Sequence, residues 1–255
     1  MNQHKNTRTD RAQLDLSTRL CTTLEEFDEC VRIQQAVWKF DDLETVPSDI
    51  FIVALKTGGQ VIGAFDGERQ VGFTLAFLAA HDREIYLHSH FAAVLPKFQG
   101  RGIGRRLKLA QRNDALQRGI RLIEWTFDPL ALVNAHFNLN RLGAVVRRYV
   151  PNFYGVTSSP LHGNIPTDRL VAEWWLDSDR VKARIAGEEN SIPSETVEIT
   201  APRNTTELLR SGSPQAGEIQ GRIRAAFLEH LAAGYSAVGV RFEDSRASYI
   251  LSRMP

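Results

Sequence analysis

A glycine-rich segment, Gln99-Gly-Arg-Gly-Ile-Gly104, follows Val94-Leu-Pro96 and opens a helical pattern. Glycines let the main chain approach a ligand closely, and the free N–H groups of a first helical turn attract phosphate groups. Six basic residues and no acidic residue occur between positions 97 and 112, namely Lys97, Arg101, Arg105, Arg106, Lys108 and Arg112. The segment predicts a local anion site; the plainer interpretation is a solvated helix face.

Side chains suited to proton transfer occur on the neighbouring segments. His88 and His90 are two residues apart on an expected strand, so both point to one face. An imidazole with a pKa of about 6.5 can accept a proton from an amine, although the same pair is compatible with packing or with a metal site. Glu124 on the next strand is a rival base, or else a solvent-facing acid.

The elements that must position these groups follow from hydrophobic periodicity. Thr23-Leu-Glu-Glu26 has the form of a capping box, and Asp66-Gly67 is typical of a hairpin turn. Strands are expected over residues 19–21, 60–65, 70–78, 84–94, 120–127, 144–150 and 169–176, and helices over 24–38, 50–55, 105–118 and 133–142. This order predicts a mixed α/β sheet, antiparallel in its first half and with α/β crossovers behind.

Composition limits the class of protein. With 255 residues, 43% apolar and 24% charged, the chain is expected to fold as one large domain or as a domain with an appendage. A net charge of +1 excludes whole-molecule attraction to polyanions, so we expect no nucleic-acid partner. Cys21 and Cys30 lack the spacing of a disulfide framework or a zinc site, which favours a reducing compartment. The longest apolar run, residues 73–80, is too short to span a bilayer, so a cytoplasmic protein with no membrane partner is expected.

The chain divides into three parts. Residues 1–17 show no hydrophobic period and are expected to form a mobile tail. Residues 18–177 contain the elements given above. Residues 178–255 are interpreted as a linker followed by a C-terminal α/β extension that docks on the main domain. A strand over 196–200, a helical stripe through Ile219 and Phe227, and a hairpin formed by 235–242 and 247–252 indicate the extension.

The glycines do not fit a dinucleotide fingerprint, because they follow an antiparallel hairpin and no acidic residue stands at a strand end about 20 residues on. Gln99-x-x-Gly102-x-Gly104, after Val94-x-Pro96 and before Ala135 to Leu142-Gly143, instead resembles the acetyl-CoA-binding core of the GNAT N-acetyltransferases over about residues 18 to 177. The stretch from His88 to Gly155 resembles a bacterial subgroup of this superfamily.

The resemblance implies a GNAT fold and an acetyl-CoA co-substrate, with no metal. It implies that Ala92, Ala93 and Val94 pair with pantetheine and the thioester, and that Asn134 contacts the pantetheine arm. The implied pyrophosphate-binding segment is Gln99, Gly100, Arg101, Gly102, Ile103, Gly104 and Arg105. An amine, on a small molecule or a peptide, would then attack the thioester directly. Separately from the resemblance, the strands near Trp174 and the hairpin over 235–252 are candidates for pairing between two copies in a homodimer.

One position departs from the family pattern. Many GNAT enzymes keep a thiolate-protonating tyrosine where this chain has Leu139, and leucine has no proton to donate. Tyr154, in Asn152-Phe-Tyr-Gly155, is the best replacement; it is otherwise a loop aromatic, with water as the proton source. The gap also favours an alternative function, a CoA-binding sensor or scaffold module without chemistry.

Overall fold

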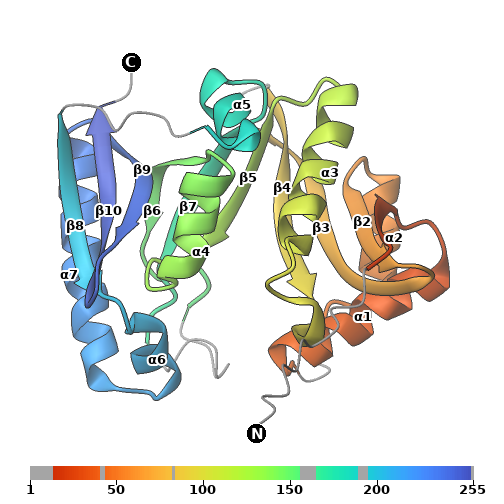
Figure 1. The fold of residues 1–255 in the computed structure, drawn as a ribbon, viewed down its shortest axis with the longest axis horizontal. Coiled ribbons are helices and arrows are strands. Elements are labelled where there is room, and N and C mark those ends of the chain that lie inside the picture. Colours follow the sequence, from red (N-terminus) through yellow and green to blue (C-terminus); the bar gives the residue numbers. More distant parts are fainter. Residues whose placement is uncertain (1–13, 41–43, 82–83, 156–164, 189–194, 254–255) are drawn as a thin grey trace, which may run out of the picture.

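The computed structural model describes residues 14–40, 44–81, 84–155, 165–188 and 195–253. Within these ranges the strands form one ten-stranded sheet in the order β1-β2-β3-β4-β5-β7-β6-β9-β10-β8 (Figure 1). The strands are β1 (Leu16–Leu20), β2 (Gln60–Asp66), β3 (Arg69–His81), β4 (Glu84–Val94), β5 (Leu122–Phe127), β6 (Val145–Val150), β7 (Arg169–Trp175), β8 (Thr196–Pro202), β9 (Tyr235–Phe242) and β10 (Arg246–Arg253). The helices are α1 (Leu24–Trp38), α2 (Ser48–Lys56), α3 (Ile103–Gln117), α4 (Leu132–His136), α5 (Asp179–Ala186), α6 (Thr205–Arg210) and α7 (Pro214–Ala232), with a 3-10 turn η1 (Pro96–Phe98) and a π turn η2 (Phe137–Arg141). The predicted mixed α/β fold is confirmed.

The first half of the sheet forms as its local sequence predicts. The Thr23 hydroxyl accepts the Glu26 N–H and the Glu26 carboxylate accepts the Thr23 N–H, so the capping box starts α1 at the expected residue. Asp66 pairs with Arg69 across the predicted turn between β2 and β3. Helices α1 and α2 bury their apolar side chains on one face of β2, β3 and β4, and α3 covers the other face (Figure 1).

Strand β4 is the central element for the site. It pairs with β3 along its length, with a register shift at His90, which stands between the paired residues Ser89 and Phe91 as a β-bulge. Its parallel pairing with β5 is limited to Leu87 with Ile123 and His88 with Glu124. Beyond His88 the two strands separate, which leaves one edge of β4 without a strand partner.

The helix expected over residues 133–142 is only half α-helical. After α4 the chain continues as the π turn η2, in which the Leu142 N–H donates to the carbonyl of Phe137 at 3.0 Å. The wider turn buries both Leu139 and Leu142 completely. It also directs the Asn140 side chain to β9, where its Oδ1 accepts the Val240 N–H at 2.8 Å. Packing against β9, which periodicity does not encode, therefore sets this geometry.

The C-terminal part joins the same sheet, because β9 pairs with β6 through Ala237 and Val146. Helix α7 packs against it, and its Arg224 donates two hydrogen bonds, of 2.7 and 2.8 Å, to the fully buried carboxylate of Asp168. Residues of both halves share one apolar cluster. Helices α5 and α6 were not predicted from the sequence, and Leu16 and Ser17, expected in the tail, begin β1. No helix of the described ranges has the length and apolar character to cross a membrane.

Candidate active site

The N-terminus of α3 has the features of an anion site. Its N-cap residue is Gly102, at a φ of 77°, and no side chain caps the helix or places an acid in its first turn. As in any helix, the first N–H groups of α3 have no intrahelical acceptor, and here no capping side chain accepts from them either. A Cβ added at Gly100, Gly102 or Gly104 would meet no atom within 4 Å, so the space beside these α-carbons is open. This arrangement can hold a phosphate group by main-chain donors and the helix dipole.

The helix N-terminus opens into a cavity of about 1030 Å³. One wall comes from the end of β4 and the loop into α3, a second from the start of α4, and a third from the C-terminal extension. The lining residues are Val94, Phe98, Gln99, Gly100, Gly102, Ile103, Gly104, Arg105, Ala131, Val133, Asn134, Phe137, Arg203, Asn204, Thr206, Glu207 and Arg210. Most of the residues expected at the coenzyme lie here, including Asn134 on α4.

Three of the expected coenzyme residues do not line the cavity. Ala92 and Ala93 lie on β4 before the cavity, with Ala92 exposed and Ala93 buried. Arg101 is exposed, and its guanidinium lies 5.8 Å from the centroid of the Phe98 ring. Gln99 has a local role as well, because its side-chain amide donates to the Val94 carbonyl at 2.9 Å and ties the loop to the end of β4.

The prediction that the basic residues concentrate positive charge at the helix N-terminus is wrong for Arg106, Lys108 and Arg112. Arg105 lines the cavity, although its Nη2 donates to the Ile185 carbonyl at 2.7 Å. Arg106 donates to the Leu16 carbonyl and Arg112 to the Leu176 carbonyl, on other sides of α3. The reason is helical geometry, because 3.6 residues per turn distribute a run of basic residues around the axis.

His88 and His90 lie on β4 where the strands begin to separate. Their ring centroids are 6.3 Å apart, and the His90 ring lies 4.2 Å from that of Phe91. Burial and the neighbouring Lys108 lower the pKa of His88. Burial and His88 lower the pKa of His90 to about 4. Burial therefore favours the neutral form of both rings.

Glu124 is paired with His88 in the sheet register, so the two side chains share a face. Its carboxylate accepts a hydrogen bond from the Arg148 guanidinium at 2.5 Å, which engages this rival base in an ion pair. Tyr154 is 47% exposed, and its hydroxyl lies 3.2 Å from the Thr126 hydroxyl near the carboxyl end of β5. The structure thus pairs His88 with Glu124 in the sheet. It places the Tyr154 hydroxyl beside Thr126, two residues farther along β5.

Lys108 is buried, although the sequence predicted it as one of the basic residues of the anion site. Its ammonium donates to Ser89 Oγ at 2.8 Å and to Gln111 Oε1 at 3.1 Å, and lies 4.0 Å from the centroid of the Trp125 ring. Burial lowers the pKa of Lys108 from 10.5 to about 7. Ser89 and Trp125 directly follow the last paired residues of β4 and β5, so Lys108 lies where the strands separate. Lys108 stands seven residues before the buried Ala115, a helical spacing that places both on the same face of α3. This spacing was the signal in the sequence that Lys108 could be buried.

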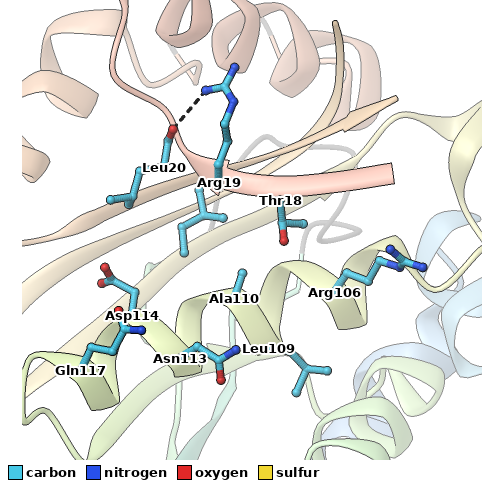
Figure 2. A pocket seen from close by; sticks show the side chains of 10 residues that line it. Thr18, Arg19, Leu20, Arg106, Leu109, Ala110, Asn113, Asp114 and Gln117 are labelled. Carbon is cyan, nitrogen blue, oxygen red and sulfur yellow. Dashed lines mark hydrogen bonds between the residues drawn. The ribbon is translucent and has the colours of Figure 1, made fainter. Parts of the chain in front are cut away.

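A second cavity, of about 430 Å³, lies between β1 and another side of α3 (Figure 2). Figure 2 shows Arg106, Asn113, Asp114 and Gln117 from α3 below Arg19, whose guanidinium donates to the Leu20 carbonyl at 3.2 Å. None of the residues predicted to act in catalysis or to bind the coenzyme lines this second cavity. We assign this cavity no role in the site. Among the described residues no group of three or more His, Cys, Asp or Glu side chains is placed to hold a metal ion.

A mixed sheet whose central parallel strands separate beside an uncapped, glycine-rich helix N-terminus can hold an extended ligand that carries phosphate groups. The model of the acetyltransferase (GNAT) family matches residues 18–143, and this part of the chain is a GNAT acetyltransferase domain. Comparison with the curated proteins gives no match.

Solved structures share this fold at low sequence identity. A protein from Desulfovibrio desulfuricans, assigned to the GNAT family, is 17% identical with a TM-score of 0.52, covering 63% of this chain and 99% of its own. The ribosomal-protein-S18-alanine N-acetyltransferase of Escherichia coli is 14% identical with a TM-score of 0.52, covering 64% and 95%. A Salmonella typhimurium protein, described with its cofactor acetyl-CoA, is 19% identical with a TM-score of 0.50, covering 64% and 95%.

Proposed function

We propose that the chain is an acetyl-CoA-dependent N-acetyltransferase that moves an acetyl group to an amine acceptor by direct attack on the thioester. The observation that carries this proposal is the open, uncapped N-terminus of α3 at one wall of a cavity of about 1030 Å³. In the proposal, the N–H groups of Ile103, Gly104 and Arg105 bind the pyrophosphate of the coenzyme. The Salmonella protein with its acetyl-CoA supports the choice of donor.

In this proposal the separated strands beside the cavity would hold the pantetheine arm. The edge of β4 from Ser89 to Val94 has no β5 partner, so its main-chain groups are available to an extended ligand. We assign Ala92, Ala93 and Val94 to this pairing, and Asn134, which lines the cavity from α4, to the arm. A main-chain N–H of this edge then stabilises the oxyanion that develops on the thioester carbonyl.

The reaction needs one base and one acid. The amine nitrogen forms a bond to the carbonyl carbon, the C–S bond breaks, the ammonium loses a proton, and the thiolate gains one. His88 is the proposed base, because its lowered pKa keeps it neutral and it shares a face with Glu124. Two groups are proposed for the thiolate proton: the Tyr154 phenol, and the Lys108 ammonium at the point of strand separation.

Coenzyme binding by the full chain is the direct test. Calorimetry with acetyl-CoA is paired with release of the CoA thiol in the presence of a panel of amines. Gly104→Glu is the informative variant, because Gly104 has an ordinary backbone conformation and its Cβ would enter open space. A carboxylate there faces the pyrophosphate and is expected to weaken binding about tenfold or more.

Gln117→Glu is the matched control, since it adds the same carboxylate at an exposed position of α3 that does not line the cavity of about 1030 Å³. It is expected to keep coenzyme affinity. Equal affinity in Gly104→Glu and the wild type would contradict the phosphate assignment.

The buried Leu139 favours a second function, a CoA-binding module without chemistry. That function predicts coenzyme binding with no thiol release for any acceptor. Turnover on one amine excludes it.

A further inference from the structure

The wall of the large cavity opposite the helix N-terminus comes from the C-terminal extension. Arg203, Asn204, Thr206, Glu207 and Arg210 line it, all from α6 or the turn before it. Neither α6 nor these residues belong to residues 18–143, the part matched by the family model. The extension therefore adds side chains to a site that the acetyltransferase domain begins.

Helix α6 is fixed to the domain beside α4. The buried Thr205 hydroxyl donates to the Leu130 carbonyl at 2.7 Å, directly before α4 begins. Leu209 is buried in the apolar cluster that both halves share. The Arg203 N–H donates to the Ser245 carbonyl at 3.1 Å, which links the start of α6 to the hairpin of β9 and β10. The position of this wall is set by packing on both sides.

The wall carries excess positive charge. Arg203 and Arg210 are exposed, and neither guanidinium forms an ion pair within the described residues; Glu207 is the one acidic residue among the lining set. The Arg203 guanidinium lies 5.3 Å from the centroid of the Phe242 ring, which supports it from the side of β9. A guanidinium group can donate two parallel hydrogen bonds to two oxygens of one phosphate group. These two arginines therefore suit a phosphate monoester.

An apolar surface lines the same cavity. Val133, at 76% exposed, and Phe137 line the cavity from α4 and η2. An exposed aliphatic and an aromatic side chain at this place suit the flat face of a nucleobase. Coenzyme A combines a pyrophosphate, an adenine and a ribose 3′-phosphate, in chemical agreement with the helix N-terminus, this apolar surface and the arginine wall.

We propose that the extension completes the coenzyme site, with Arg203 and Arg210 binding the 3′-phosphate of coenzyme A. This inference rests on the proposed acetyl-CoA-dependent function. It gives residues 203–210 a role in donor selection, namely preference for coenzymes that carry the 3′-phosphate.

The test compares coenzyme A with dephospho-coenzyme A, which lacks only the 3′-phosphate. Calorimetry on the full wild-type chain is expected to show tighter binding of coenzyme A by about tenfold or more. In the double variant Arg203→Gln with Arg210→Gln, affinity for coenzyme A falls to that for dephospho-coenzyme A, whose own affinity stays unchanged. Arg222→Gln is the control, because it removes an exposed arginine of α7 that does not line this cavity.

Each outcome decides between the claims. Binding of coenzyme A with the same discrimination in the wild type and the double variant overturns the arginine assignment and leaves the proposed function standing. Equal loss of both ligands in the double variant also overturns it, because the effect is then not at the 3′-phosphate. A wild type that binds neither ligand overturns the proposed function and the inference together.

Discussion

Lys108→Met tests whether a cation is buried where β4 and β5 separate. The wild-type ammonium is fully enclosed, and burial lowers its pKa from 10.5 to about 7. Between these values the unfolded chain holds the proton and the folded chain does not. The free energy of unfolding of the wild type therefore gains a contribution that rises with pH across this window, and below pH 7 the penalty of the buried charge is fully present.

The size of the effect follows from this pKa. Well above pH 7 each pH unit corresponds to about 1.4 kcal/mol, and at pH 7 the folded chain is only half deprotonated, so the wild type gains about 2 kcal/mol relative to Lys108→Met between pH 7 and pH 9. The variant also removes the hydrogen-bond donor to Ser89 Oγ and Gln111 Oε1. That loss does not depend on pH, so the slope, and not the offset, reports the buried charge.

Urea unfolding followed by far-UV circular dichroism at pH 6, 7, 8 and 9 measures the difference. Lys56→Met is the control, because Lys56 is exposed at the end of α2 and its loss is expected to give a small difference with little slope. A difference between wild type and Lys108→Met that stays constant from pH 7 to pH 9 would refute a lowered pKa and, with it, an ammonium able to give up its proton near neutrality.

The other predictions concern proton transfer and docking of the extension. His88→Gln is expected to lower kcat and to remove an inflection of the pH–rate profile below neutral pH. His90→Gln is expected to keep the wild-type profile above pH 6, because burial lowers the pKa of His90 to about 4. Profiles in which only His90→Gln has an effect would reverse the assignment of the base. Tyr154→Phe is expected to slow turnover at an unchanged KM for acetyl-CoA, and an unchanged kcat would leave the phenol without a part in the reaction. Arg224→Met is expected to lower the free energy of unfolding by about 3 kcal/mol, because the buried Asp168 carboxylate loses its cation and two hydrogen bonds and keeps only those from Tyr149 and Asn152. A loss below 1 kcal/mol in urea titrations would show that the pair contributes little.

Local sequence determined much of the fold. The capping box at Thr23 and the Asp-Gly turn after Asp66 act within a few residues, so α1 and the β2–β3 hairpin formed where periodicity placed them. The glycines before α3 have the same local character, because a residue at a φ of 77° and an uncapped helix start are decided by nearby chain geometry. The predicted phosphate site depends on these local features.

Tertiary structure decided what long-range packing controls. The sequence shows Lys108 as one cation among six, and only the arrangement of α3 over β4 and β5 turns it into the interior. The π turn that buries Leu139 depends on β9, about 100 residues away in the chain. The same holds for Arg203 and Arg210, which line the cavity of about 1030 Å³ because β9 continues the sheet at β6. Periodicity reports which face of an element is apolar, but the partner of that face is chosen by packing between residues far apart in sequence.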